Sequence, residues 1–186
     1  CAKYGAYMLS DEVHGDMVMD GNHYNPMGLV DAIQDKLVVY TAISKTFNLA
    51  GLIGSYHIIY SEYLRDRVEK QSRLSGYNHM NVLSMHALIG AYEPAGEAWV
   101  DELCEVLSGN VSWACNYIAE HFEGVRVSKP QGTYMLYLDC HEWLEKHGKS
   151  LDELLRAGIA VGVIWQDGSA FRQPDTIRLN LALPRT

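Results

Sequence analysis

Four side chains in this sequence are of types that could act together on a small molecule: Asp11, His14, Lys45 and Arg178. Lys45 follows the apolar run LVVY, and a lysine amine beside an apolar wall loses its proton more readily, as a Schiff-base nucleophile requires. Asp11 also follows a short apolar segment, with His14 three residues later. Arg178 lies in TIRLNLAL, where a guanidinium held on a strand can bind a carboxylate through two hydrogen bonds.

Each of these residues also has an ordinary structural interpretation. Lys45 could be an exposed loop lysine, and Asp11 could be a turn or capping aspartate. His14 taken alone is more often a structural histidine than a catalyst, and Arg178 could form a weak surface ion pair. The catalytic interpretation therefore depends on the combination of the four residues.

Hydrophobic patterning predicts the elements that position Asp11 and Lys45. Short apolar segments predict buried strands over residues 6–9, 36–41 and 54–60, with a short helix over 29–34. Strands separated by helices or long loops favour a mainly parallel α/β sheet. In open sheets of this kind, ligands bind at the carboxyl ends of strands, so we expect Asp11 and Lys45 at the same sheet edge.

The second half of the chain has the pattern of an α+β domain. Helical spacing of apolar residues predicts helices over 61–73, 81–92 and 93–122, and Ser150 with Glu153 forms a capping box before a helix over 151–158. Strands are expected over 133–139, 158–165 and 176–183. We expect residues 1–92 and residues 93–186 to belong to different domains, with the long helix as the hinge.

Strand alternation divides the last predicted strand between two faces. One face should carry three aliphatic side chains, and the other should carry Arg178 between two polar residues; the two sets are Ile177, Leu179 and Leu181, and Thr176, Arg178 and Asn180.

Composition and charge exclude several classes of protein. The chain has 186 residues and a formal net charge of −8, which disfavours nucleic-acid binding and attachment to an anionic membrane surface. No apolar run approaches the 18 residues of a membrane span. The four cysteines include no CxxC pair, so we expect no zinc or other metal site and no disulfide framework, as in a cytoplasmic protein.

Four segments, taken in this order, resemble a known family: SDEVHGDMV, TAISKTFNLAGL, GTYMLYLD and IRLNLALPR. They resemble the second half of fold-type-I enzymes of the class I/II aminotransferase superfamily, which depend on pyridoxal 5'-phosphate (PLP). The chain is more similar to the cystathionine β-lyase and cysteine C–S lyase branch, because Asp-Glu-Val-His replaces the usual Asp-x-x-Tyr and Ser-Lys-Thr-Phe-Asn-Leu-Ala-Gly surrounds the lysine. The resemblance covers essentially all 186 residues.

The resemblance implies a fold and a set of site residues. The fold would be part of the mainly parallel sheet of the PLP-transferase large domain, followed by an α+β C-terminal small domain whose last helix is missing. Lys45 would form a Schiff base with PLP and move the Cα proton, while Asp11 would pair with the pyridine nitrogen. The other implied contacts are His14 near the 3'-oxygen, Ser44 and Thr41 at the phosphate, and Arg178 on the substrate α-carboxylate.

The resemblance also implies an activity with alternatives. We expect a C–S β-lyase that converts cystathionine or a related cysteine derivative to a thiol, pyruvate and ammonia, acting as a homodimer on amino-acid substrates. A class I/II aminotransferase is the first alternative, and an inactive folded fragment or binding module is the second. Both ends of the chain suggest a piece of a longer protein, so the fragment alone is expected to be inactive.

Two positions depart from the family pattern near the lysine. Many relatives have a phosphate-binding arginine eight residues after the lysine, where this chain has Ile53. A serine is common three residues before the lysine, where this chain has Ala42. Either the phosphate is held weakly or other parts of the site hold it.

Overall fold

The computed structural model describes residues 1–184, and the chain divides into two compact units. The first unit comprises Cys1–Val18 and His23–Glu102, and the second comprises Met19–Asn22 and Leu103–Thr186. The division falls within the long helix α3 (Pro94–His121). The bounds of α3 confirm the helix predicted over 93–122.

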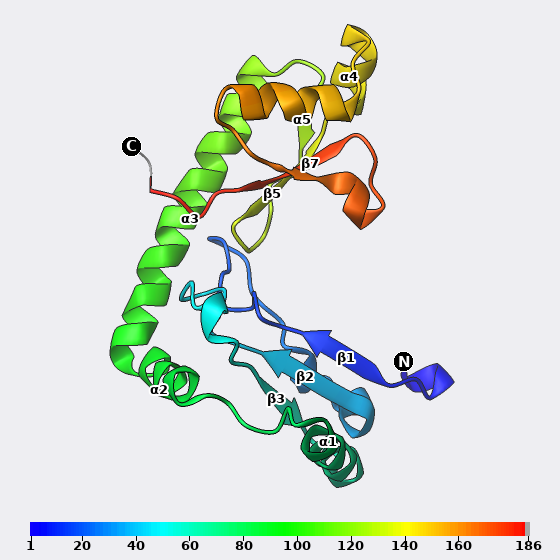
Figure 1. Cartoon of the computed structure of the whole chain (residues 1–186), viewed down its shortest axis with the longest axis vertical. Helices are drawn as coiled ribbons and strands as arrows, with labels where there is room; N and C mark the ends of the chain where they lie inside the picture. The colour runs from blue at the N-terminus through cyan, green and yellow to red at the C-terminus, as the bar shows by residue number, and fades with distance from the viewer. Residues whose placement is uncertain (185–186) are drawn as a thin grey trace. The chain divides into compact units, whose positions relative to one another are not determined.

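The first unit contains a three-stranded sheet in the order β1 (Met8–Asp11), β2 (Leu37–Thr41), β3 (Tyr56–Ile59) (Figure 1). β1 and β2 are parallel, as predicted, and β3 runs antiparallel to β2. β2 is the central strand, and its continuous apolar run has the pattern of a strand buried on both faces. Leu37, Val38 and Val39 are each no more than 5% exposed.

The first strand differs from its prediction in position and burial. It spans Met8–Asp11 rather than residues 6–9, and partly buried and exposed side chains alternate along it. Leu9 is 71% exposed because β1 forms an edge of this sheet and only Met8 joins the cluster around Leu37 and Val39. The two-residue shift places Asp11 within the strand, as its last residue.

The first unit also contains two whole helices, four 3₁₀ segments and the first part of α3. The N-cap residue of α1 (Glu62–Ser75) is Ser61, whose side chain accepts a hydrogen bond from the Leu64 N–H. The N-cap residue of α2 (Val82–Ala91) is Asn81, whose side chain accepts a hydrogen bond from the Ser84 N–H. The helix predicted over 29–34 is a 3₁₀ segment instead. The four segments are Ala2–Tyr4, Met27–Leu29, Asp31–Lys36 and Ala50–Leu52.

The second unit contains an antiparallel sheet in the order β4 (Arg126–Val127), β5 (Met135–Asp139), β7 (Thr176–Asn180), β6 (Gln166–Asp167). Side chains from α3, α4 (His141–His147) and α5 (Leu151–Ala160) pack against the aliphatic residues of β5 and β7. Ile177, Leu179 and Leu181 all contact these helical clusters, as the predicted alternation requires. The capping box of Ser150 and Glu153 is present.

The strand predicted over residues 158–165 is wrong. α5 continues to Ala160, the chain turns through Gly162 at a φ of +83°, and β6 begins only at Gln166. A short apolar run fits a strand or a buried helix end equally well, and here the capped helix extends into it. Gly158 is required because a Cβ there would stand 2.7 Å from the Trp165 ring.

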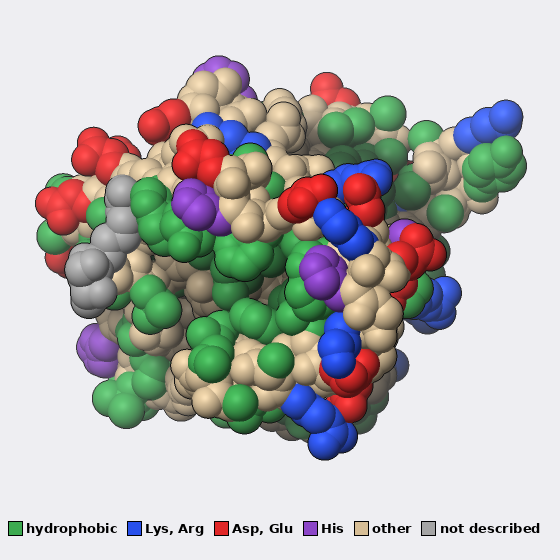
Figure 2. Space-filling model, turned by 90° about the horizontal axis from the view of Figure 1, so that it is seen from above, with side chains coloured by type: hydrophobic (Ala, Val, Ile, Leu, Met, Phe, Trp, Pro, Cys, Tyr) green, Lys and Arg blue, Asp and Glu red, His purple; other side chains and the backbone are tan. Residues whose placement is uncertain are grey.

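Exposed hydrophobic side chains are visible on the surface among charged ones (Figure 2). Tyr77 and Ile53 are each 88% exposed, and Ile164 is 83% exposed. Large exposed apolar side chains are typical of surfaces that contact another protein or that promote aggregation when left uncovered. Within residues 1–184, no helix is both long and apolar enough to cross a membrane.

Within residues 1–184, the four cysteines form no disulfide bonds. Cys140 is 2% exposed, and burial, reinforced by the carboxylates of Asp139 and Asp175, raises the pKa of its thiol to about 11. This thiol therefore stays protonated and unreactive near neutral pH. In the described part of the chain, no three His, Cys, Asp or Glu side chains are arranged to hold a metal ion.

His141 is expected to make the stability of the protein depend on pH. Its Nδ1 lies 3.0 Å from Asp175 Oδ2 and its Nε2 lies 3.4 Å from Glu145 Oε1, and these contacts, the Asp175 hydrogen bond first, raise the pKa of the imidazole above 6.5. Because the folded-state pKa is raised, the stabilisation is fully present below pH 6.5 and is lost as pH rises through the folded pKa.

His141→Gln should therefore lower the free energy of unfolding below pH 6.5 and have less effect above the folded pKa. Denaturant unfolding across this range measures the difference. His86→Gln on α2 is the control, because His86 has no carboxylate partner among residues 1–184. Equal pH dependence of the two variants would contradict the prediction.

Candidate active site

Asp11 lies at the carboxyl end of β1, directly opposite Tyr40 of β2. The Glu12 N–H donates to the Tyr40 carbonyl at 2.8 Å, which extends the pairing of the two strands one residue past Asp11. The Asp11 side chain is exposed, and its Oδ1 accepts a long hydrogen bond of 3.4 Å from the Val13 N–H. The carboxylate is thus fixed at a sheet edge and remains accessible.

The turn after Asp11 is fastened at both ends. Glu12 Oε1 accepts hydrogen bonds from Ser10 Oγ at 2.8 Å and from the Met27 N–H at 3.0 Å. The Met17 N–H donates to the His14 carbonyl at 3.2 Å, and the Met17 side chain is buried. His14 lies within this turn and is partly buried.

Lys45 lies in the turn that follows β2. The chain leaves the sheet through the buried residues Ala42 and Ile43, and the turn closes with a hydrogen bond of 3.0 Å from the Phe47 N–H to the Ile43 carbonyl. Lys45 is partly buried, and within residues 1–184 its amine forms no hydrogen bond or ion pair.

A direct contact joins the two loops. Thr46 is 2% exposed, and its Oγ1 donates a hydrogen bond of 2.8 Å to Asp16 Oδ2, on the loop of Asp11 and His14. The Trp99 indole N–H donates to the Thr46 carbonyl at 3.4 Å. The structure thus links the loops of Asp11, His14 and Lys45, which come from two adjacent parallel strands.

Thr41 and Ser44, the proposed contacts of the phosphate, lie at the end of β2 and in the turn that follows it. Ser44 is partly buried beside Lys45, and its carbonyl accepts from the Leu49 N–H at 2.9 Å. Thr41 ends β2, where alternation from Tyr40 places its side chain on the opposite face from Asp11. Ile53, at the position of the family's arginine, is 88% exposed with a φ of +53°, an unusual conformation for a β-branched residue.

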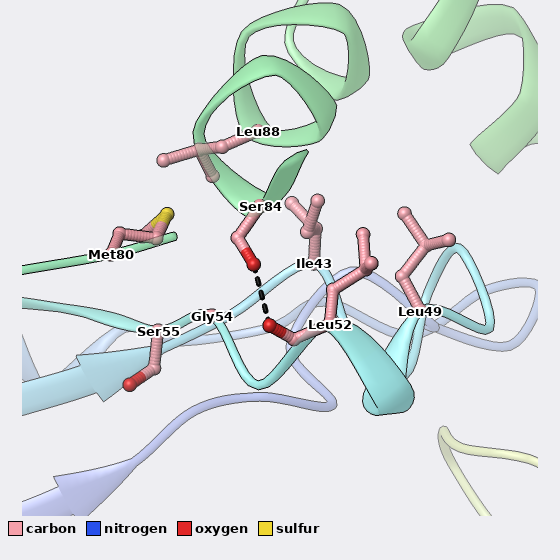
Figure 3. A pocket seen from close by; sticks show the side chains of 8 residues that line it. All are labelled: Ile43, Leu49, Leu52, Gly54, Ser55, Met80, Ser84 and Leu88. Atoms are coloured by element: carbon pink, nitrogen blue, oxygen red, sulfur yellow. Dashed lines mark hydrogen bonds between the residues drawn. The ribbon is translucent and has the colours of Figure 1, made fainter. Parts of the chain in front are cut away.

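The segment after Lys45 is anchored to α2. Asn81 Nδ2 donates to the Leu52 carbonyl at 2.6 Å. Ser84 Oγ donates to the same carbonyl at 2.5 Å (Figure 3). The side chains around this contact enclose a crevice of only about 10 Å³, so it serves packing rather than ligand binding. Gly54 is needed here, because a Cβ would lie 2.8 Å from Ser84 Cβ.

Arg178 belongs to the second unit, in the middle of β7. It pairs with Tyr137 of β5 and Gln166 of β6, and its guanidinium donates a hydrogen bond to Gln166 Oε1. The guanidinium also stacks 4.5 Å from the centre of the Phe171 ring. A Cβ at Gly168 would overlap Thr176 Oγ1, so glycine lets the Phe171 turn approach β7 closely.

Sequence reasoning missed the residues that hold the predicted ones in place: Asp16, Thr46, Trp99, Gln166 and Phe171. Asp16 and Thr46 were within the motifs that drew attention to Asp11 and Lys45, so their polar side chains beside the candidate residues were an available signal. The partners themselves are set by tertiary contacts, 30 residues apart in the case of Asp16 and Thr46.

The chain is similar to a known protein family and to named members of it. The whole chain, residues 1–186, matches the family model described as aminotransferase class I and II. The chain is 30% identical over 159 residues to cystathionine beta-lyase PatB of Bacillus subtilis strain 168, and the match covers 85% of this chain and 41% of PatB.

Solved structures of PLP-bound proteins also resemble this chain. The chain resembles cystalysin from Treponema denticola, which contains a pyridoxal 5'-phosphate cofactor, with a TM-score of 0.86 and 25% identity. It also resembles the PLP-bound C–S lyase from Staphylococcus hominis, with a TM-score of 0.84 and 26% identity. Each match covers 96% of this chain and 45% of the other, so the chain spans less than half the length of these proteins.

Proposed function

The chain belongs to the class I and II aminotransferase family, a PLP-dependent family, and from this premise we propose that a full-length protein containing it is a C–S β-lyase. Its substrate would be L-cystathionine or a related cysteine thioether. The reaction breaks the Cβ–S and Cα–H bonds, releases a thiol, and consumes one water molecule to give pyruvate and ammonia.

The residues present fit a PLP cofactor. A covalently held aldehyde needs a primary amine that can lose its proton, and Lys45 is partly buried with no ion pair among residues 1–184. A pyridine nitrogen needs a carboxylate partner to remain protonated, and Asp11 offers one at the carboxyl end of the adjacent parallel strand. When bound, PLP supplies an electron sink for the electron pair released at Cα.

The chain's own residues then have separate tasks. The neutral Lys45 amine takes the proton from the substrate Cα, Asp11 holds a proton at the pyridine nitrogen, and Arg178 binds the substrate α-carboxylate. His14 is proposed near the cofactor 3'-oxygen, with Ser44 and Thr41 as proposed contacts of the phosphate. The stacked guanidinium of Arg178 supports its assignment, because a planar fork in a fixed orientation suits two parallel hydrogen bonds.

One observation carries this proposal: Asp11 ends one of two adjacent parallel strands, Lys45 lies in the turn after the other, and Asp16 and Thr46 join their loops. The lyase is preferred because PatB is named a cystathionine beta-lyase and the Staphylococcus hominis protein a C–S lyase. Transamination is the second candidate, because the family model that matches the whole chain is described as aminotransferase class I and II. Transamination would use the same lysine amine.

We further propose an organisation for the full-length protein. Residues 1–92 would belong to the larger, cofactor-binding domain and residues 93–186 to the small domain. The protein would act as a cytoplasmic homodimer, and the chain by itself would be inactive because it spans less than half the length of the relatives it matches.

The test is a spectrum followed by a product assay on the full-length protein. With PLP added, a visible cofactor band is expected, and L-cystathionine should then yield pyruvate and thiol in equal amounts. Keto acid formed only when an amino acceptor is supplied would move the assignment to an aminotransferase. A protein that stays colourless with PLP would contradict both enzyme assignments.

A further inference from the structure

Thr46 is held more firmly than its place in a turn requires. It is 2% exposed, although its neighbour Lys45 is partly open to solvent. Its hydroxyl donates to Asp16 Oδ2 at 2.8 Å, and its carbonyl accepts from the Trp99 indole at 3.4 Å. Side chain and backbone of one residue are therefore both fixed, by partners from two different segments.

We propose that Asp16 is a positioning residue for Lys45 and that it acts through Thr46. The proposal rests on the function proposed above, in which the Lys45 amine reacts with the cofactor and with the substrate proton. Asp16 would act on the reaction through the hydrogen bond that it accepts from Thr46, the residue that follows the lysine.

The physical argument concerns the direction of the lysine side chain. Lys45 has four rotatable side-chain bonds and no partner of its own among residues 1–184, so its backbone must set where the chain starts. The Thr46 Cα lies in the planar peptide that joins it to Lys45, so holding the Thr46 side chain in place also restricts that peptide. Reaction rates depend steeply on such placement.

The position of Asp16 gives the contact a second consequence. Asp16 lies five residues after Asp11, on the same loop as His14, and this loop is held to β2 and to the Met27 segment. The hydrogen bond to Thr46 therefore keeps the amine and the Asp11 carboxylate in register. Loss of the bond should disturb their relative placement more than it disturbs the fold.

Four variants of the full-length protein test the proposal. Thr46→Val removes the buried hydroxyl at nearly constant volume, and Thr46→Ser restores it. Asp16→Ala removes the acceptor from the exposed side, so it reports the same contact if Thr46→Val fails to fold. Ser84→Ala is the matched control, because Ser84 is also 2% exposed and also loses a hydroxyl hydrogen bond, but it does not touch residue 46.

The first readout is the amount of PLP attached to Lys45 after borohydride reduction, measured by peptide mass spectrometry against time and PLP concentration. The second is the division of any loss between kcat and KM. Thr46→Val and Asp16→Ala should each slow attachment and lower kcat about 10- to 100-fold, with KM nearly unchanged. The double variant should lose no more than either single one, because both remove the same bond.

Ser84→Ala should lower the melting temperature and leave attachment at the wild-type rate, and Thr46→Ser should recover most of the rate. Wild-type attachment in both Thr46→Val and Asp16→Ala would overturn the positioning role alone. A Ser84→Ala loss as large as that of Thr46→Val would also overturn it, because the effect would then be general destabilisation. Wild-type protein that attaches no PLP at Lys45 would overturn the proposed function, and the positioning role with it.

Discussion

Replacing Lys45 with arginine in the full-length protein is expected to abolish measurable elimination while leaving the protein folded. Arginine keeps the positive charge and the approximate length of the side chain, but its guanidinium does not lose a proton in proteins. It can neither hold the cofactor covalently nor accept the Cα proton. The loss of proton transfer alone corresponds to about 10²- to 10⁴-fold in rate.

The measurement is kcat with L-cystathionine, together with the visible band of bound PLP and the melting temperature. Lys36→Arg is the matched control, because Lys36 is also partly buried and adjoins the opposite end of β2. Lys45→Ala adds a chemical test, since a small primary amine in solution should restore part of its rate. Retention of the PLP band and of most of kcat in Lys45→Arg would exclude Lys45 as the reactive amine.

The elements with strong local signals could be predicted from the sequence. The capping box of Ser150 and Glu153 begins α5 at the expected place, and the long periodic segment gives α3 almost to the residue. The strand LVVYT is correct because a central strand buried on both faces needs a continuous apolar run. These features depend on residues that are close together in the chain.

Features that depend on distant partners could not be predicted. GIAVGVIW has the apolar content of a strand, but its first residues finish α5 and its later ones form the turn through Gly162 toward β6. The antiparallel direction of β3 also has no local signal, because alternation along a strand is the same in either direction. Strand direction is fixed by the path of the connection.

The candidate site also combines features that depend on local sequence with features that depend on distant contacts. Asp11 and Lys45 could be chosen as candidates because each follows an apolar run of sequence, and parallel pairing of β1 and β2 brings the ends of those strands to one edge. The Asp16–Thr46 contact joins two loops, and its two residues are 30 positions apart in the sequence. The sequence around neither residue indicates which side chain it will contact. The sequence therefore indicates candidate reactive groups more readily than the tertiary contacts around them.

Replacing Arg178 with lysine should weaken binding of amino-acid substrates about 10- to 100-fold. A lysine keeps the charge but loses one of the two parallel hydrogen bonds to the carboxylate, and a hydrogen bond to a charged group contributes about 1.5–3 kcal/mol. It also loses the planar surface that stacks 4.5 Å from the Phe171 ring and the hydrogen bond to Gln166 Oε1. Phe171→Leu should have a smaller effect, because an exposed cation–π contact contributes about 0.5–1 kcal/mol.

The proposed contact between Arg178 and the substrate α-carboxylate can be tested by changing the ligand as well as the protein. Dissociation constants of an amino acid and of its α-carboxamide are measured from the change in the PLP band of the full-length enzyme. Arg178→Lys should weaken binding of the acid and leave the amide nearly unchanged, because only the acid presents a carboxylate to the guanidinium. Arg156→Lys on α5, an exposed arginine paired with Asp152, is the control in the same unit and should change neither. If Arg178→Lys weakened acid and amide equally, the arginine would be acting on the fold of β6 and β7 rather than on the substrate, since its pairing with Gln166 joins those two strands.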